Sequence, residues 1–170
     1  MHKRVREKFN ALLDQHCHLW PDALVLDVGS LDLNGSLRAT IESRGWKYVG
    51  LDVVPGANVD HVARDPYRYS LPECADLIIS NATIEHVGLP WRWMRALADC
   101  AAHSARVIVM CPWNMEPHAT PRDYWRILPD GLAALMDDAG LAVIEAGRDD
   151  VYSWAVGVKV ESDGSDTWRE

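Results

Sequence analysis

An apolar run that ends in a glycine turn stands near the start of the chain and reads Val25-Leu26-Asp27-Val28-Gly29-Ser30-Leu31-Asp32-Leu33-Asn34-Gly35. An amphipathic stretch follows it, and a second apolar run ends in Asp52, 23 residues after Gly29. This order of strand, glycine turn, helix and acidic strand end builds a nucleoside site at the edge of a parallel sheet. Glycine lets the backbone approach a ligand closely, and Asp52 falls where a carboxylate can accept both hydroxyls of a ribose.

The rest of the chain alternates patterns of helix and strand. Val5, Phe9, Leu12 and Leu13 recur at helical spacing, which predicts an N-terminal helix within residues 1–19. Thr120-Pro121 predicts a short helix, because threonine is a good N-cap and proline suits the first helical position. Further helices are predicted over residues 37–45, 94–101 and 129–139, and strands over residues 23–28, 48–52, 59–63, 77–79, 107–110, 141–146 and 152–160.

The last two predicted strands are joined by the polar turn Gly147-Arg148-Asp149-Asp150. Parallel neighbours need a crossover of a dozen or more residues, so a connection this short makes the two strands antiparallel. We therefore expect an otherwise parallel α/β sheet that closes with a C-terminal hairpin.

The composition predicts one globular domain over residues 1–160, with a polar tail at 161–170. The chain has 170 residues, of which 48% are hydrophobic and 25% are charged, and this length can bury a core. No window approaches 18 consecutive apolar residues and no apolar signal core follows Met1, so we expect a cytoplasmic protein without a membrane partner. The net charge of −8 disfavours nucleic acid as a partner without excluding it.

The cysteines and histidines give no metal-binding pattern. The four cysteines stand at positions 17, 74, 100 and 111, without the short C-x-x-C spacing of a zinc site or a redox pair. The cluster His16-Cys17-His18 lies at the end of a predicted helix, where adjacent side chains diverge by about 100°. We therefore expect free, mostly buried thiols and no metal.

Two further landmarks narrow the class of the nucleoside site. They are Asp76-Leu77-Ile78-Ile79-Ser80-Asn81-Ala82-Thr83-Ile84-Glu85-His86-Val87 and the segment from Arg126-Ile127-Leu128-Pro129-Asp130-Gly131-Leu132 to Ala139-Gly140-Leu141. With them, residues 20–160 resemble the class I S-adenosylmethionine-dependent methyltransferases. The chain is most similar to a small single-domain subgroup with a G-S-x-D-x-N-G turn, here Gly29 to Gly35, and with a segment like Asp123-Tyr124-Trp125-Arg126 before the last helix.

The resemblance implies an α/β, Rossmann-like fold with a seven-stranded, mostly parallel sheet, one antiparallel strand in the C-terminal hairpin and helices on both faces. It implies S-adenosyl-L-methionine as the cofactor. The residues expected to hold it are Asp27, Gly29 and Ser30 at the methionine portion, Asp52 at the ribose, Asp65, Pro66 and Tyr67 at the adenine, and Asn81 beside the methyl group. Asp52, Asp65 and Asn81 each keep a second interpretation as a cap or turn residue.

The connection from Cys111 to Asp130 is long for a compact domain, as lids and binding loops are. We expect Trp113, Asn114, Tyr124 and Arg126 in this loop to contact the methyl acceptor. A histidine that titrates near neutrality suits proton removal from an acceptor, so His118 and His86 are the candidate bases. Two interpretations stay open: Glu85-His86 as a structural element, and residues 123–126 as a fastening of the loop to the domain.

Three classes of function fit these patterns. The first is a methyltransferase that acts on a small molecule, a sugar or a polymer terminus, so that a small-molecule or glycan-type acceptor is the expected partner. The second is an NAD(P)-dependent oxidoreductase, since an acidic residue after the second strand also suits NAD; the missing G-x-G-x-x-G and the closing hairpin weigh against it. The third is a non-catalytic module of the same fold that binds a nucleoside cofactor. The acceptor, the methylated element and the oligomeric state remain open.

Overall fold

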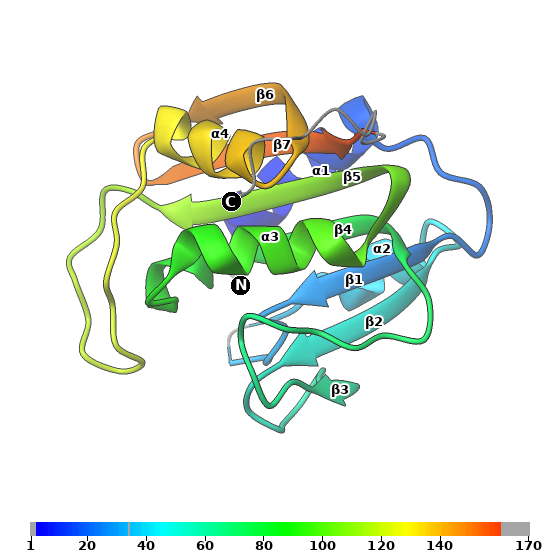
Figure 1. The fold of residues 1–170 in the computed structure, drawn as a ribbon, viewed down its shortest axis with the longest axis horizontal. Helices are drawn as coiled ribbons and strands as arrows, with labels where there is room; N and C mark the ends of the chain where they lie inside the picture. The colour runs from blue at the N-terminus through cyan, green and yellow to red at the C-terminus, as the bar shows by residue number, and fades with distance from the viewer. Residues whose placement is uncertain (1–2, 34, 161–170) are drawn as a thin grey trace, which may run out of the picture.

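The computed structural model of the protein describes residues 3–33 and 35–160. It contains seven strands with helices between them (Figure 1). The helices are α1 (Lys3–His16), α2 (Arg38–Glu42), α3 (Pro90–Cys100) and α4 (Pro129–Asp138), with the 3-10 helix η1 (Ile84–His86). The strands are β1 (Leu24–Val28), β2 (Lys47–Asp52), β3 (His61–Val62), β4 (Ala75–Asn81), β5 (Ala101–Pro112), β6 (Leu141–Arg148) and β7 (Tyr152–Lys159).

The strands form one sheet in the order β3-β2-β1-β4-β5-β7-β6. β1, β2, β3, β4 and β5 pair in parallel, whereas β7 runs antiparallel to both β5 and β6. β1 and β4 are neighbours although β2 and β3 lie between them in sequence, so the order reverses beside β1. The carboxyl ends of β1, β2, β4 and β5 therefore face one edge of the sheet, the left edge in Figure 1.

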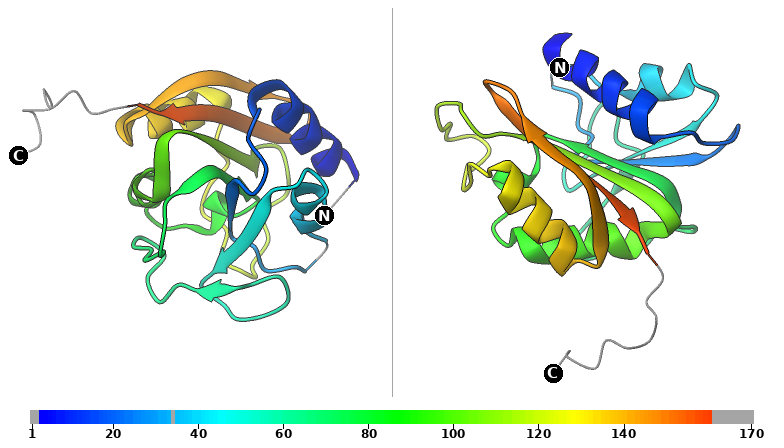
Figure 2. Two further views of the ribbon diagram at one scale, coloured as in Figure 1. Left: turned by 90° about the vertical axis from the view of Figure 1, so that its right-hand side faces the viewer. Right: turned by 90° about the horizontal axis from the view of Figure 1, so that it is seen from above.

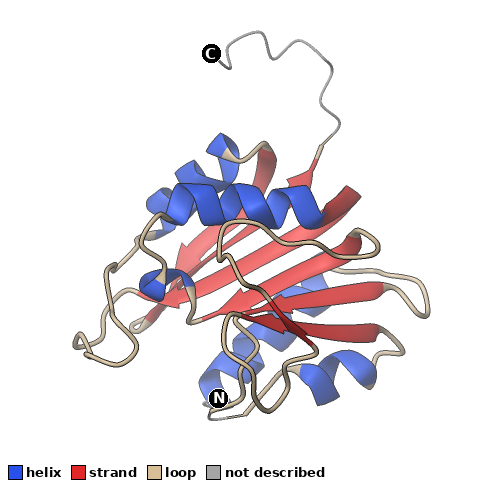
Figure 3. Cartoon of the chain, turned by 60° about the horizontal axis from the view of Figure 1, so that its bottom comes forward, coloured by secondary structure: helices blue, strands red, loops and turns tan. Residues whose placement is uncertain are grey.

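Two apolar cores fill the two faces of this sheet. On one face α1 and α2 pack through Phe9, Leu13 and Ile41 against Val25 and Ile79. On the other face α3 and α4 pack through side chains such as Trp93, Leu97 and Met136. Figures 2 and 3 show these helix pairs on opposite sides of the strands. Buried on both faces, the central strands consist of continuous apolar runs, as in other parallel sheets.

Most of the sequence-based expectations for the fold are confirmed. The seven strands, the single reversed strand in the C-terminal hairpin and the helices on both faces occur as predicted. Gly45 and Gly140, which follow α2 and α4, have φ angles of 77° and 76°, the left-handed conformation in which glycine ends a helix. The predicted helix at Thr120-Pro121 is wrong, since these residues form a turn inside an irregular loop over residues 113–128.

Parts of three predictions lie outside the described residues. These are the polar tail at 161–170, the first two residues of the N-terminal helix, and Asn34 of the glycine turn. Within the described ranges, no helix is both long and apolar enough to cross a membrane.

Candidate active site

A pocket of about 360 Å³ opens at the carboxyl edge of the sheet, a volume within the range of small-molecule sites. Its wall combines residues between 27 and 37 with residues 81–86 and parts of the loop over 112–121. Val5 of α1 and Tyr152 of β7 complete it. Segments that are far apart in sequence thus meet where α/β folds bind their ligands, at the point of strand-order reversal.

Gly29 is the first residue of the turn after β1 and has a φ of 82°. A Cβ atom at this position would lie 1.9 Å from Oγ1 of Thr83, the residue that precedes η1. The side chain of Thr83 in turn donates a 3.4 Å hydrogen bond to the carbonyl oxygen of Val28. Glycine is therefore required twice, for its left-handed conformation and for the close approach of the segment that follows β4.

Asp27 lies at the end of β1, 7% exposed, and its carboxylate accepts a hydrogen bond from the hydroxyl of Tyr48. Asn58 Nδ2 donates to that hydroxyl (2.7 Å) and to the carbonyl of Ser30 (2.8 Å), and so ties β2 to the glycine turn. Burial raises the pKa of Asp27 to about 6, an effect that the hydrogen bond from Tyr48 opposes. A buried carboxylate held in this way suits a cationic ligand group.

Asp52 ends β2, and both of its carboxylate oxygens are already fixed by the backbone. Oδ2 accepts a hydrogen bond from the amide of Leu31 (3.0 Å), and Oδ1 accepts one from the amide of Val54 (3.0 Å). Each oxygen keeps a second lone pair, so the carboxylate is oriented without being saturated. Asp52 thus joins the loop after β2 to the turn after β1.

Ser30 and Asn81 place unpartnered polar atoms at the pocket. The Ser30 hydroxyl and the Asn81 side-chain oxygen are buried and have no hydrogen-bond partner in the protein, and both residues line the cavity. Most buried polar atoms in proteins are hydrogen-bonded, so atoms like these are candidates for a bond to a ligand.

Asp65 and Tyr67 do not line the pocket beside the glycine turn. Both line a second hollow of about 460 Å³, together with Arg92 of α3, whose guanidinium lies 5.1 Å from the centre of the Tyr67 ring. The Asp65 carboxylate accepts a hydrogen bond from the Tyr67 amide, which is the turn interpretation of this residue. The Pro66 carbonyl accepts one from the Tyr69 hydroxyl. The first pocket therefore contains only part of the predicted cofactor set.

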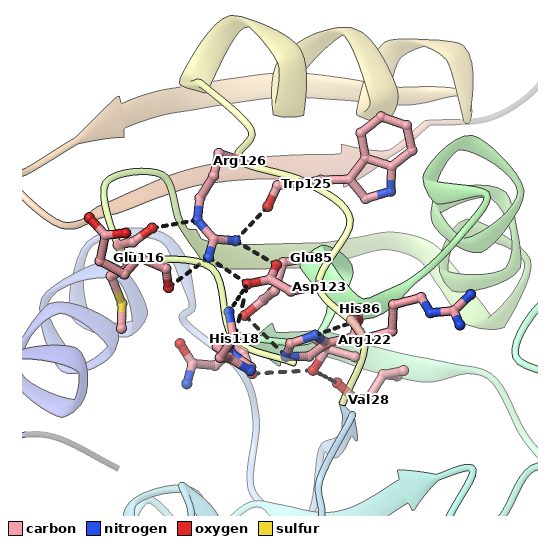
Figure 4. Close-up of polar contacts among 12 residues, drawn as sticks. Val28, Glu85, His86, Glu116, His118, Arg122, Asp123, Trp125 and Arg126 are labelled. Atoms are coloured by element: carbon pink, nitrogen blue, oxygen red, sulfur yellow. Dashed lines mark hydrogen bonds and ion pairs between the residues drawn. The ribbon is translucent and has the colours of Figure 1, made fainter. Parts of the chain in front are cut away.

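The loop over residues 113–128 is held by Arg126. All five N–H donors of its guanidinium have acceptors within the loop: the two carboxylate oxygens of Asp123 and the carbonyls of Met115, Glu116 and Trp125 (Figure 4). The same ion pair lowers the pKa of Asp123 to about 2. With no free donor, Arg126 acts here as the fastening of the loop, the alternative that the sequence left open.

The other three residues predicted to contact the acceptor do not line the cavity. Trp113 Nε1 donates to the carbonyl of Asp149 (2.8 Å) and Asn114 Nδ2 donates to that of Asp150 (2.9 Å), both in the β6–β7 turn. Tyr124 is 46% exposed and, like Trp113 and Asn114, does not line the pocket. The loop residues that do are Pro112, Met115, His118, Thr120 and Pro121. The loop residues that line the pocket thus differ from those predicted to contact the acceptor. Hydrogen bonds to the hairpin hold Trp113 and Asn114, and hydrogen bonds within the loop hold Arg126.

Glu85, His86 and His118 meet at the pocket wall, where η1 faces the loop (Figure 4). The rings of His86 and His118 lie edge to face, 5.0 Å apart. His86 Nδ1 lies 3.0 Å from the carbonyl of Arg122 and must carry its proton to make that bond. Burial lowers the pKa of His86, which favours the neutral ring. His118 contacts Asp123, with 3.9 Å between Nε2 and Oδ2.

Sequence reasoning named both histidines and passed over Glu85, Met115, Thr120, Pro121 and Tyr152. For Glu85 only a weak signal existed, its place between the apolar residues Ile84 and Val87. The structure shows that Glu85 is 2% exposed. The loop and hairpin residues carried no such signal, because their place in the wall depends on how two distant segments fold over the sheet edge. No group of metal-ligating side chains occurs among residues 3–33 and 35–160.

We expect Arg126→Met to loosen the loop without unfolding the sheet. The exchange removes two charge-assisted hydrogen bonds, each worth about 1.5 to 3 kcal/mol, and leaves the carboxylate of Asp123 unpaired. Amide hydrogen exchange over residues 113–128 should accelerate at least about tenfold, while β4 and β5 keep their protection. Arg122→Met, which removes an exposed guanidinium from the same loop, is the control and should leave exchange unchanged. Equal exchange in both variants would show that Arg126 does not hold the loop.

Comparison with solved structures shows that this is the class I methyltransferase fold. The 1,6-didemethyltoxoflavin-N1-methyltransferase of Burkholderia thailandensis, solved with S-adenosylhomocysteine, is similar with a TM-score of 0.70 and 17% identity, over 92% of this chain and 88% of that one. For magnesium protoporphyrin IX methyltransferase of Synechocystis PCC 6803, also with S-adenosylhomocysteine, the values are 0.68 and 17%, over 93% and 83%.

A third similar structure is the [4+2]-cyclase SpnF, with a TM-score of 0.72 and 12% identity over 92% of this chain and 81% of that one. This fold is therefore not confined to proteins described as methyltransferases. No protein-family model matches the chain. No curated protein matches its sequence at a significant level.

Proposed function

We propose that the protein is an S-adenosylmethionine-dependent methyltransferase that acts on a small-molecule acceptor. The observation that carries this proposal is the pocket at the strand-order reversal, where the Gly29 turn, the buried Asp27 carboxyl and the unpartnered atoms of Ser30 and Asn81 share one wall. Similar folds solved with S-adenosylhomocysteine support the choice of cofactor. A sugar or polymer terminus stays a predicted alternative as acceptor.

The residues of this chain fit a nucleoside cofactor with a charged amino-acid portion. Gly29 leaves open backbone where a side chain would clash, Ser30 supplies an orphaned hydroxyl, and Asp27 supplies a carboxyl for an amino group. Asp52, already oriented by two amides, has lone pairs free for the ribose hydroxyls. Asp65, Pro66 and Tyr67 remain the proposed adenine contacts, which requires the second hollow to belong to the same site.

When bound, the cofactor would supply an electrophilic methyl group on a sulfonium. The protein then has to align the acceptor with that methyl group and to exclude water, and little covalent chemistry falls to its side chains. His118 and His86 line the pocket as candidate bases for an acceptor that must lose a proton. In the tautomer that the Arg122 carbonyl selects, the free nitrogen of His86 is Nε2, which can accept a proton.

The test is a binding comparison between S-adenosylhomocysteine and NAD. At 100 times its dissociation constant, a ligand of the native state adds about 2.7 kcal/mol to the free energy of unfolding. We expect a thermal-shift measurement to show this stabilisation with S-adenosylhomocysteine and none with NAD or NADP. Stabilisation by NAD alone would refute the methyltransferase and favour the oxidoreductase. Binding of S-adenosylhomocysteine without methyl transfer to any acceptor would favour the non-catalytic module.

A further inference from the structure

Glu85 is a buried carboxyl that the site described so far leaves unexplained. It follows β4 in η1, is 2% exposed and lines the pocket. Its Oε2 atom has no hydrogen-bond partner in the protein. Its Oε1 atom lies 3.8 Å from Nε2 of His86, too far for a direct hydrogen bond. An unpartnered buried carboxyl destabilises a protein, so its position calls for a partner that a ligand brings.

Two other groups of the pocket wall offer hydrogen-bond acceptors without a partner in the protein. Asn81 presents an unpartnered oxygen to the same pocket, and His86 presents Nε2 as a lone pair because Nδ1 donates to the Arg122 carbonyl. No lysine or arginine is among the described residues that line the pocket, and the nearby Arg126 has no donor left. Asp27 adds a second carboxyl to the wall.

From this arrangement we infer that the acceptor is a basic amine, and that Glu85 binds its ammonium form and takes up the proton that must leave before methylation. An ammonium offers three N–H donors and a positive charge, which match Glu85 Oε2, His86 Nε2 and Asn81 Oδ1. Carboxylate and phosphate acceptors would meet like charge and lone pairs. An alcohol would bring one donor and no charge. This inference rests on the methyltransferase function proposed above.

The proton step balances without a further reactant. The ammonium gives one proton to the Glu85 carboxylate, which leaves a neutral amine and a neutral carboxylic acid. The amine lone pair then forms the N–C bond as the bond between carbon and sulfur breaks, and its electron pair stays on sulfur. The product is a methylated ammonium, which leaves in its charged form, so one proton is released per transfer: the proton that Glu85 later returns to solvent. His86, whose Nε2 faces Glu85, is placed to carry the latter proton outward.

Burial raises the pKa of Glu85 to about 8 in the free protein, with Asp123 adding to the rise and Arg126 opposing it. The other titratable groups that face it are His86 on η1, Cys111 on β5 and Tyr152 on β7. An ammonium binds the ionised carboxylate, so its affinity should increase by up to tenfold per pH unit from pH 6 toward pH 8. An amine whose own pKa lies above 9 stays charged over this range, so the slope reports on the protein.

Calorimetry with two sets of matched probes tests the inference: benzylamine, benzyl alcohol and benzoate, and butylamine, butanol and butyrate. Each is titrated at pH 6, 7 and 8 with and without saturating S-adenosylhomocysteine, so the cofactor arm judges the methyltransferase proposal separately. We expect at least one amine to bind at least tenfold more tightly than its matched alcohol and acid. Glu85→Gln should abolish both this preference and the pH slope, whereas Glu116→Gln, on the exposed loop, should change neither.

Folding of Glu85→Gln is monitored independently. In the native state the pKa of Glu85 is raised to about 8, whereas its ordinary pKa, which applies in the unfolded chain, is 4.5. The native protein therefore loses stability through Glu85 as the pH rises between these values, and the glutamine variant should melt at a higher temperature than the parent at pH 8. Amine affinity that is unchanged in Glu85→Gln, tighter binding of the alcohol or acid, or no binding of either amine would each overturn the inference.

Discussion

Replacement of Gly29 by alanine is expected to lower the free energy of unfolding by about 2 to 5 kcal/mol. Two costs add at this position. An L-residue in the left-handed region costs about 1 to 2 kcal/mol, and a Cβ placed 1.9 Å from Thr83 Oγ1 forces two packed segments apart, which costs about 1 to 3 kcal/mol. Chemical denaturation of the two proteins measures the difference directly.

Gly45→Ala provides a matched control for this variant. Gly45 has nearly the same φ angle, 77° against 82°, but a Cβ atom there would have no neighbour within 4 Å. Its replacement should therefore cost only the conformational part, about 1 to 2 kcal/mol. Thr83→Gly in the Gly29→Ala background should recover part of the steric cost, which a double-mutant cycle would show as a coupling energy. Equal losses for Gly29→Ala and Gly45→Ala would mean that Thr83 yields without strain.

Asp52→Ala is expected to weaken binding of S-adenosylhomocysteine by about 10-fold to 100-fold. The proposal assigns the ribose hydroxyls to this carboxylate, and charge-assisted hydrogen bonds of that kind contribute about 1.5 to 3 kcal/mol. The effect includes some disorder of the turn, because the variant also removes the acceptor of the Leu31 and Val54 amides. Calorimetry at matched salt measures the affinity.

Two comparisons make the Asp52 result specific. Asp52→Asn keeps one oxygen acceptor and the side-chain shape, so its affinity should fall between those of the parent and the alanine variant. Asp150→Ala removes an equally charged but 92% exposed carboxylate in the hairpin turn and should bind like the parent. An unchanged affinity in folded Asp52→Ala would remove Asp52 from the cofactor site and leave it as a link between two loops.

One part of the candidate site could be predicted from the sequence and another part could not. Asp27, Gly29, Ser30 and Asn81 line one pocket because each lies at or just after a strand end, and strand ends can be recognised from local apolar runs and turn residues. The sequence predicts that Arg126 contacts the acceptor because it lies in the long connection from Cys111 to Asp130. Its five partners include carbonyls ten and eleven residues away, an arrangement that no local pattern encodes.

Glu85 illustrates the same division within a single residue. Its position after β4 follows from the apolar run of that strand. Its Oε2 atom has no partner because Arg126, some forty residues further along the chain, pairs with Asp123 instead. The two histidines, by contrast, both line the pocket, because side chains after β4 and β5 meet at one edge of any such sheet. Their role as bases stays a prediction.

Periodicity and turn chemistry predicted the glycine turn, the C-terminal hairpin and, apart from the helix at Thr120-Pro121, the order of strands and helices along the chain. These features depend on residues close in sequence. Tertiary packing determined which side chains of the irregular loop line the cavity and which form hydrogen bonds within the protein. Trp113 and Asn114 face the β6–β7 turn because their donors find carbonyl acceptors there. Such pairings join segments more than thirty residues apart, and their geometry exists only once the sheet has brought the two strands side by side.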